Sequence, residues 1–550
     1  MMPQRTFRET ETVDFVVVGS GAAGGVLAKE LSTAGFDVVV LEQGPLQRPN
    51  EFTHDELATE REGAMLNVAF EPYQSFRAGD EEPWSRNPAR GLVYRRGVGG
   101  SSVHFAANYW RLRPIDFRER SVLGSIAGTS FADWPITYEE LEPYYTKVDW
   151  EIGVSGAPGP FDARRSRPYP LPPMPNKSSG VLLERGARAL GLHAQVAPVA
   201  ILSQPYDGRS ACMACGHCSY YGCEFNAKSS TLATVIPKAV ATGRCEIRAE
   251  STAFRVETNS AGRATGVSYY DRDGREHRQG ARAVILAANG AETARLLLLS
   301  ESSRFPEGLA NSSGAVGRNI MFNGHSSTFG VFEHPLNEYK GAVASRVVQD
   351  FYDTDPKRGF YGGGGIDARF NYGPIGFALD TLPPDVPKWG LEYKRALRRY
   401  FSRSVRFMAH ITSLPVPTNT VTLDPDHRDR WGRPGLRLTY LDHPDDMKAK
   451  RWFRDRTHAL MEAAGAAKVW DQPVTRIDGG VHLLGTARMG NDPKTSVVDR
   501  YHRAHDVPNL FVCDGSSFVT SGRGQPTMTI QALAFRAAEH IARFARSHAV

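Results

Sequence analysis

Short apolar runs and amphipathic stretches alternate near the start of the chain. Residues 13–18 are almost wholly apolar and predict a buried strand, and a glycine-rich turn follows at once. Residues 25–34 place apolar side chains on one face and predict a helix. Residues 37–41 form a second apolar run that ends at Glu42. The order strand, glycine turn, helix and strand predicts a βαβ unit with an acidic residue at its tip.

The rest of the chain carries two kinds of strand pattern. Residues 245–289 alternate as strands do, with a turn expected at Asp273-Gly274, and end in a buried strand that leads into a helix over residues 292–300. Residues 325–440 contain several alternating segments, which favour an antiparallel sheet. The remaining expected elements are a short strand within residues 505–512 and a helix from about Thr529 onward.

Segments typical of a nucleotide-binding fold occur at both ends and in the middle of the chain. We therefore expect an α/β protein whose domains are interleaved in sequence. Residues 13–320, with gaps, and residues 481–550 are assigned to a Rossmann-like domain that includes a cysteine segment at residues 204–230. Residues 321–480, with parts of 45–95, are assigned to a substrate-binding domain built on the antiparallel sheet.

The glycine turn has the G-x-G-x-x-G spacing of a dinucleotide site and reads Gly19-Ser20-Gly21-Ala22-Ala23-Gly24. Glycines at these positions let the backbone turn tightly and approach a pyrophosphate, which the helix N-terminus attracts. Glu42 lies at the distance expected for an acid that accepts hydrogen bonds from ribose hydroxyls. The motif predicts a dinucleotide cofactor and does not decide between FAD and NAD.

Composition and charge exclude several classes of protein. The 550 residues are 41% hydrophobic and 23% charged, as in an ordinary globular protein, and no stretch approaches 18 apolar residues. The net charge of +6 is spread along the chain, without the basic face and module of a nucleic-acid reader. A short basic cluster at residues 394–399 fits a solvated helix face, and a patch for an anionic partner or membrane surface is the alternative. The first residues show no export signal, so the chain itself is expected in the cytoplasm.

Four of the six cysteines fall within twelve residues: Cys212, Cys215, Cys218 and Cys223. Such clustering in a large chain favours metal or redox chemistry over a disulfide framework. Thiolates at two-residue gaps suit an iron–sulfur cluster, of the 3Fe-4S or 4Fe-4S type. Zinc is the main alternative because it also takes four thiolates, and disulfides across such short gaps would be strained.

Several further motifs resemble those of the glucose–methanol–choline (GMC) oxidoreductases, in the family's order and over essentially the whole chain. They include Arg96-Gly97-Val98-Gly99-Gly100-Ser101-Ser102, Asp133-Trp134-Pro135, Ala288-Asn289-Gly290, His482 to Gly490, Cys513-Asp514-Gly515-Ser516 and Gln525-Pro526-Thr527-Met528. The resemblance implies FAD as the cofactor and oxidation of an alcohol. The first domain is then an FAD-binding domain.

The resemblance also implies roles for single residues. His482 matches the histidine that the family places beside flavin N5, where it takes the hydroxyl proton. Gln525 stands where the family more often has His or Asn, and it can orient a hydroxyl without acting as a base. Residues matching flavin contacts are Gly99, Gly100 and Ser101 of the second loop, Asp514 and Gly515 at the ribityl chain, and the backbone around Thr527 and Met528.

His104 falls where some members of the family bond a histidine covalently to the flavin, and a non-covalent packing histidine is the alternative. The cysteine segment itself resembles the catalytic subunits of bacterial iron–sulfur sugar dehydrogenases, glucoside 3-dehydrogenase above all. That resemblance implies a small partner subunit bearing an export signal, a cytochrome as the electron acceptor, and a periplasmic site reached by co-export.

The function expected from the sequence is therefore an FAD and iron–sulfur dehydrogenase of a sugar or glycoside. An oxygen-using oxidase with zinc or free cysteines is the alternative, and a non-catalytic sugar-binding subunit is a third hypothesis, disfavoured by the presence of His482. Polar residues considered for substrate contact are Asn323, His325, His410 and Asn419.

Overall fold

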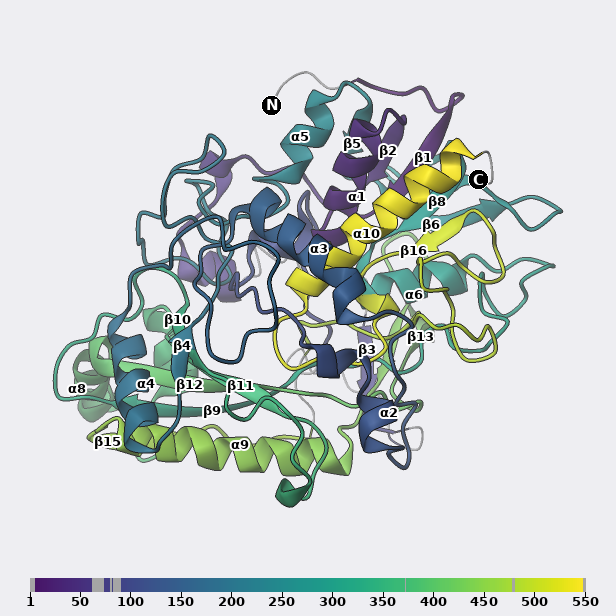
Figure 1. Ribbon diagram of the computed structural model, residues 1–550. Coiled ribbons are helices and arrows are strands. Elements are labelled where there is room, and N and C mark those ends of the chain that lie inside the picture. The colour runs from purple at the N-terminus through teal and green to yellow at the C-terminus, as the bar shows by residue number, and fades with distance from the viewer. Residues whose placement is uncertain are drawn as a thin grey trace.

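The computed structural model describes residues 5–61, 74–79, 82, 91–370, 372–476 and 480–547. Within them the chain forms three sheets with helices packed around them, as the α/β assignment predicts (Figure 1). Part of the segment 45–95, assigned from the sequence to the substrate-binding domain, lies outside the described residues. The division into two domains stays a prediction.

The first sheet has seven strands in the order β5-β2-β1-β8-β7-β6, with β16 also paired to β8. Strands β5, β2, β1, β8 and β16 run parallel, whereas β6, β7 and the first half of β8 form an antiparallel meander. The strands are β1 (Thr12–Val18), β2 (Val38–Leu41), β5 (Cys245–Arg248), β6 (Thr252–Thr258), β7 (Ala264–Tyr270), β8 (Glu276–Leu286) and β16 (Leu510–Val512).

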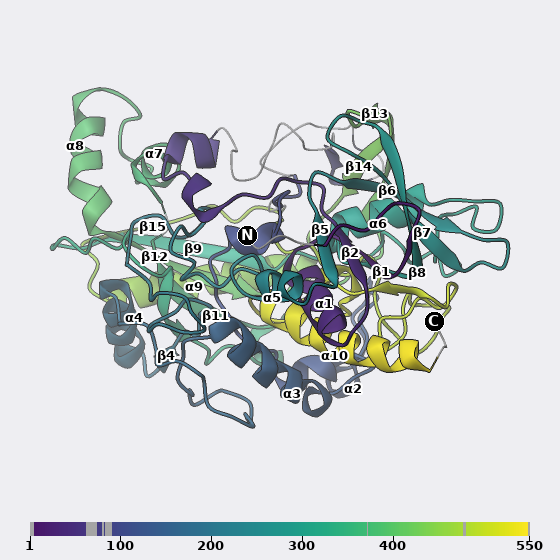
Figure 2. The same cartoon turned by 90° about the horizontal axis from the view of Figure 1, so that it is seen from above.

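The parallel strands lead into helices whose first turns lie at one edge of this sheet. Helix α1 (Ala22–Thr33) follows β1, and α6 (Asn289–Leu299) follows β8. Helix α10 (Thr527–Arg546) packs along α1 and α3 (Tyr138–Val148), as Figures 1 and 2 show. This edge, where strands end and helices begin, is where doubly wound folds bind their ligands.

The second sheet is antiparallel and six-stranded, in the order β15-β9-β12-β11-β10-β4. Its strands are β4 (Ala194–Val196), β9 (Gly324–Val331), β10 (Ala344–Val348), β11 (Gly364–Arg369), β12 (Ser404–Ile411) and β15 (Lys468–Asp471). Helices α4 (Ser178–Ala189) and α9 (Pro444–Ala463) cover one face of it. Strand β4 comes from the range that the sequence assigned, with gaps, to the nucleotide-binding domain.

The two faces of this sheet differ in chemistry because side chains alternate along each strand. On β12, Val405, Phe407, Ala409 and Ile411 enter an apolar core with the α4 and α9 helices. The intervening residues of β12 are Arg406, Met408 and His410, and all three line a cavity on the other face. The alternation thus builds a sheet with an apolar back and a polar front.

The third sheet joins β13 (Thr420–Arg428), β14 (Pro434–Thr439) and β3 (Gln74–Arg77). The other helices are α2 (Glu119–Leu123), α5 (Val235–Ala241), α7 (Pro374–Gly376) and α8 (Gly390–Tyr400). No helix among the described residues has the length and apolar character that a membrane span needs. The helices predicted at 25–34, 292–300 and from Thr529 are confirmed, each beginning two to three residues earlier as α1, α6 and α10.

Candidate active site

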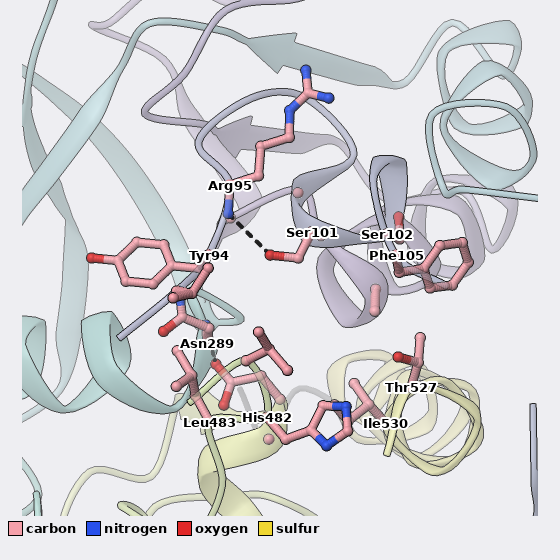
Figure 3. Close-up of a pocket in the computed structure, with 18 of the residues that line it drawn as sticks. Tyr94, Arg95, Ser101, Ser102, Phe105, Asn289, His482, Leu483, Thr527 and Ile530 are labelled. Atoms are coloured by element: carbon pink, nitrogen blue, oxygen red, sulfur yellow. Dashed lines mark hydrogen bonds between the residues drawn. The ribbon is translucent and has the colours of Figure 1, made fainter. Parts of the chain in front are cut away.

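One large cavity of about 430 Å³ lies at the edge where β1 and β8 end and α1 and α6 begin. The turn η5 (Gly100–Val103), the start of α10 and the polar front of the second sheet complete its walls. Figure 3 shows His482 and Leu483 on one side of this cavity, and Ser101 and Ser102 on the other.

Most residues predicted for the site line this cavity. They are Gly19, Gly21, Ala22, Ala23, Glu42, Gly100, Ser101, His104, His482, Asp514, Gly515, Gln525 and Thr527. Gly24, Gly99 and Met528 are not among the lining residues, and the Met528 side chain is fully buried in the core. The fold therefore brings together residues as far apart in sequence as Gly19 and Thr527, because the strands of the first sheet come from both ends of the chain.

The glycines of the first loop are needed for two different reasons. Gly19 has φ +94°, and a Cβ there would lie 2.5 Å from the Ala287 carbonyl oxygen. A Cβ on Gly24 would come within 1.9 Å of the Gly19 carbonyl oxygen, so the fold itself requires both glycines. Gly21 has φ −66°, and a Cβ there would meet only the Gly100 Cα, at 3.9 Å. Packing thus leaves the space before Gly21 open, as the approach of a pyrophosphate requires.

Glu42 is buried, and protein groups hold its carboxylate. It accepts hydrogen bonds from Ser20 N (3.0 Å), Ser20 Oγ (2.7 Å), Gly44 N (3.1 Å) and Gly97 N (3.2 Å). Burial raises the pKa of Glu42, and these four donors oppose that rise. The side chain therefore ties the end of β2 to both glycine loops, in addition to lining the cavity where a ribose contact is predicted.

Asp514 plays a comparable part at the other end of the site. Its carboxylate accepts from Asn289 N (3.0 Å), Thr293 Oγ1 (2.6 Å) and Ser516 N (2.7 Å). These bonds join the segment after β16 to the first turn of α6, where a carboxylate suits the helix dipole. Burial raises the pKa of Asp514, and the donors lower it.

Among the residues that the structure describes, His482 has one side-chain hydrogen-bond partner, Asn323. Its Nδ1 lies 2.8 Å from Asn323 Oδ1, an amide oxygen that can only accept. Asn323 Nδ2 donates in turn to the carbonyls of Gly522 (3.2 Å) and Ile411 (3.4 Å), which fixes the orientation of the amide. Nδ1 must therefore carry the proton, and Nε2 is left as the basic nitrogen.

The surroundings of His482 keep it neutral. Burial lowers its pKa to about 3, and the nearby His410 and Arg369 add to the effect. The rings of His325 and His482 lie 6.1 Å apart, and those of His325 and His410 lie 5.2 Å apart. Burial also lowers the pKa of His325 well below its usual range. The imidazole is thus unprotonated at neutral pH, and its Nε2 lone pair is available to a substrate hydroxyl.

Gln525 is fixed by a chain of buried polar groups. Its Nε2 lies 2.9 Å from His410 Nδ1, and His410 Nε2 lies 3.0 Å from Asp367 Oδ2. Burial opposes ionisation of Asp367, but the Arg369 guanidinium and His410 hold the pKa of that carboxyl below its usual range. With Nε2 donating to His410, the amide oxygen of Gln525 remains for a substrate hydroxyl.

His104 connects this cavity with the cysteine segment. It is buried, lines the cavity, and its Nδ1 has no hydrogen-bond partner within the described part of the chain. Its carbonyl oxygen accepts from Tyr220 N at 2.8 Å, and the Lys228 ammonium donates to the carbonyls of Phe105 (3.2 Å) and Cys218 (2.6 Å). Ser219 and Tyr220 also line the cavity. One short stretch of chain thus separates the cysteines from the large cavity.

The four clustered cysteines line one small hollow of about 20 Å³, together with His217 and Lys228. All six cysteines of the chain are free thiols, so the disulfide alternative is not supported. Over the described ranges no group of three or more His, Cys, Asp or Glu side chains is arranged to hold a metal ion. The donor set fits an iron–sulfur cluster or zinc in kind, but the thiols do not stand in ligand positions.

The structure adds Asp367, Arg369 and Arg406 to the site, which the sequence did not indicate. They lie on β11 and β12, and the two arginines line the cavity. The sequence showed that side chains alternate along these strands, but it did not show which face of the second sheet would line the cavity. Of the polar residues considered for substrate contact, His325 and His410 line the cavity. Asn419 instead bonds the backbone of Leu441.

Two family models described as GMC oxidoreductase match the chain, over residues 13–323 and 415–534. The chain belongs to the GMC oxidoreductase family. Relatives of this family member include 2-methyl-1,2-propanediol dehydrogenase of Mycolicibacterium austroafricanum, 36% identical over 97% of this chain and 96% of the relative. The fructose dehydrogenase large subunit of Gluconobacter japonicus is 30% identical over 97% of this chain and 98% of its own length.

The gluconate 2-dehydrogenase flavoprotein of Pantoea cypripedii is 29% identical over 97% of this chain and 94% of its own length. Among solved structures, a formate oxidase of Aspergillus oryzae RIB40 superposes with a TM-score of 0.69 at 16% identity, covering 99% of this chain and 100% of that one. That similarity supports the fold.

Family membership and the open space before Gly21 together identify FAD as the cofactor that the cavity fits. The protein is an FAD-dependent oxidoreductase of the GMC family that acts on CH–OH groups of alcohols or sugars. When bound, FAD supplies the acceptor for the hydride that leaves the alcohol carbon. His482 as the base and Gln525 as the residue that orients the substrate stay predictions, and both residues line the cavity.

Proposed function

We propose that this GMC oxidoreductase is a dehydrogenase that oxidises a hydroxyl of a sugar or glycoside to a ketone or lactone. The observation that carries the proposal is His482 at the cavity wall, held by the buried Asn323, together with Gln525, which His410 holds in the same cavity. His482 accepts the hydroxyl proton, and Gln525 binds the hydroxyl without acting as a second base. Fructose and gluconate dehydrogenases among the relatives support a sugar-type substrate.

His482 acts as the only base of the reaction in this proposal. Asn323 keeps the proton on Nδ1, so the lone pair of Nε2 faces the substrate hydroxyl. Removing that proton raises the electron density on the alcohol oxygen and makes the adjacent carbon a better hydride donor. The buried Asp367 holds His410, and His410 holds Gln525. Gln525 then keeps the substrate oriented with little motion.

We further propose that Cys212, Cys215, Cys218 and Cys223 bind an iron–sulfur cluster that accepts electrons one at a time. The spacing of the cysteines supports this, and so does the contact of their segment with the loop around His104. The thiols must turn toward one another on binding. The His104 imidazole, buried and unbonded at Nδ1 among the described residues, suits covalent attachment of the flavin.

The wider assembly is part of the same proposal. A small subunit with an export signal and a cytochrome acceptor would place the enzyme in the periplasm, and glucoside 3-dehydrogenation is the activity to test. The fructose dehydrogenase relative is by its name the large subunit of an assembly, which supports a partner.

Two other activities have specific support. The relative from Mycolicibacterium is a diol dehydrogenase, so a small vicinal diol is a second substrate class to test. An oxygen-using oxidase is the other candidate, because paromamine 6'-oxidase of Streptomyces fradiae, 29% identical over 96% of this chain and 91% of its own length, is by its name an oxidase. Peroxide released in the presence of substrate and oxygen would favour it.

The deciding experiment is anaerobic purification, with the partner subunit if required, followed by absorption and EPR spectra and iron and sulfide analysis. Flavin bands that bleach with a sugar, together with iron, labile sulfide and a cluster EPR signal, are expected. Flavin without iron or sulfide, or with stoichiometric zinc, would overturn the iron–sulfur part and favour the oxidase.

A further inference from the structure

Two arginines stand side by side on the polar front of the second sheet. Arg369 of β11 and Arg406 of β12 are directly opposed in the antiparallel register, so their side chains leave the same face. Both are at least nine-tenths buried, and both line the cavity that His482 and Gln525 also line. Like charges opposed across strands are destabilising unless a negative charge lies between or beside them.

Within the described part of the chain, a carboxylate balances only one of these two charges. Arg369 forms an ion pair with Asp367, which lies two residues earlier on β11. Asp367 is itself shared with His410 (3.0 Å) and with Asn108 Nδ2 (3.2 Å). The carboxylate is therefore fully used, and it offers nothing further to Arg406.

Arg406 has only neutral partners among the described residues. Its Nε donates to Ser327 Oγ (2.9 Å), Nη1 to Tyr372 Oη (3.1 Å) and Nη2 to Gln472 Oε1 (3.4 Å). Three of the five guanidinium N–H groups are thereby used, and two remain. A buried guanidinium without a counter-ion is costly, and a carboxylate matches its paired N–H groups.

The carboxylates that line the cavity are each already held by other protein groups. Glu42 is held by Ser20, Gly44 and Gly97, Asp514 by the start of α6, and Glu292 by Tyr94 and Arg295. The substrate end, marked by His325, His410 and His482, is left with excess positive charge and neutral histidines. That end of the cavity is built to receive an anion.

We propose that the substrate carries a carboxylate, which binds between Arg406 and Arg369 while the hydroxyl to be oxidised faces His482 and Gln525. The substrate class is a sugar acid or another polyhydroxylated acid. This inference rests on the proposed function and narrows its substrate class. The Cα atoms of Arg406 and His410 are about 13 Å apart along the strand, at ~3.3 Å per residue, and the long arginine side chain spans part of that distance.

The carboxylate also has an electrostatic effect on the base. Burial lowers the pKa of His482 most, and the charges of His410 and Arg369 lower it further. An anion bound beside Arg369 offsets the part that Arg369 contributes. The bound acid therefore makes His482 a stronger base when the substrate is in place. A neutral polyol of the same length lacks this effect and the salt link.

Matched substrate pairs test the proposal on the purified holoenzyme. D-gluconate with D-glucitol, D-galactonate with galactitol, and D-xylonate with xylitol differ chiefly in a carboxylate against a CH₂OH group. We expect kcat/KM for flavin reduction to be at least tenfold higher for the acid in a pair that reacts, as one charge-assisted hydrogen-bond pair provides. In Arg406→Gln this acid-to-polyol ratio should fall about tenfold or more, and Arg406→Lys should restore part of it.

Arg398→Gln is the matched control because it removes the same charge from the exposed face of α8. It should leave the acid-to-polyol ratio as it is in the parent enzyme. Equal rates for every acid and polyol, or a ratio that Arg406→Gln does not change, would overturn the anion site while the proposed function stood.

A second measurement needs no turnover. Glutarate has two carboxylates and no hydroxyl, so it should perturb the flavin absorption on binding and bind at least tenfold more weakly to Arg406→Gln. If no sugar, polyol or acid reduces the flavin but glutarate binds through Arg406, the proposed function fails and the anion site stands. If glutarate binds the parent and Arg406→Gln equally, the anion site is refuted even if Arg406→Gln folds less well.

Discussion

The His482 centre and the cysteine hollow are both rich in reactive groups, and the protein organises them differently. At the first, each group has a fixed neutral partner: Asn323 for His482 and His410 for Gln525. At the second, four thiols line one hollow but no metal-binding arrangement exists among the described residues.

The difference has a physical cause. Neutral imidazole and amide groups form hydrogen bonds with each other, so the protein alone can orient them. Thiolates repel one another. Burial raises the pKa of Cys212 and raises that of Cys218 to about 11, so these two thiols stay protonated without a cation. We therefore expect the groups around His482 to be in place before the substrate binds. We expect the cysteines to become ordered only when a metal cluster binds.

The largest effect should come from removing the base. His482→Ala should keep the flavin bound and lower its rate of reduction by substrate by about 10²–10⁴, because general base catalysis is lost. Anaerobic stopped-flow absorption would measure it. Flavin bleaching at the parent rate would refute the assignment of His482.

A substitution in the cysteine hollow should slow the second half of the reaction, in which electrons leave the flavin for an acceptor. Cys218→Ser should lose iron and sulfide and transfer electrons to a one-electron acceptor at least a hundredfold more slowly, while substrate still bleaches the flavin. Cys245→Ala, which changes a buried thiol in β5, is the control and should keep the metal content. Unchanged iron and acceptor rates in Cys218→Ser would show that the hollow binds no cluster.

The two glycine roles can be separated in the cofactor site. Gly21→Ala should fold with an unfolding midpoint close to the parent apoprotein but bind FAD about tenfold more weakly, because its Cβ enters open space needed by the cofactor. Gly19→Ala should destabilise the fold itself, since its φ is +94° and its Cβ meets the Ala287 carbonyl. Equal FAD affinity in Gly21→Ala and the parent would contradict a pyrophosphate at this loop.

Substitution of Asn323 tests how much the fixed tautomer of His482 contributes to the rate. Asn323→Ala should lower kcat by about tenfold with little change in KM, because the Nδ1–H tautomer of His482 is no longer enforced. Asn323→Asp should restore part of the rate and move the acid limb of the pH–rate profile upward, since a carboxylate favours the charged imidazole. A profile that does not shift would leave Asn323 a purely structural residue.

The smallest effect concerns stability. Burial lowers the pKa of His104, His325 and His410, and lowers that of His482 to about 3. The unfolded chain, with histidine pKa values of about 6.5, binds more protons than the folded one below that pH. Stability is therefore present above pH 6.5 and should fall by up to about 1.4 kcal/mol per pH unit for each histidine as the pH drops toward 5.

Thermal unfolding of the holoenzyme from pH 8 to pH 5 would show this as a fall of several degrees. His502→Gln removes a buried histidine that does not line the cavity and whose pKa is lowered to about 4, so it should reduce the slope. A midpoint that is constant between pH 6.5 and 5 would contradict the depressed histidine pKa values.

Local patterns predicted much of the fold. The strand at residues 13–18, its glycine turn and the following helix depend on adjacent residues, and β1 and α1 confirm them. The turn at Asp273-Gly274 likewise lies between β7 and β8. The polar front of the second sheet was not predictable, because the alternation on β12 does not say which face α9 covers.

The sequence by itself determined the family, the dinucleotide fold, His482 as the proposed base and the grouping of the cysteines, because these depend on residue type and short spacing. The tertiary structure decided which nitrogen of His482 is basic and what holds Gln525. It also placed Arg369 beside Arg406. These features depend on contacts between segments that are distant in the sequence. The register of the strands sets those contacts, and register is fixed only when the sheet packs.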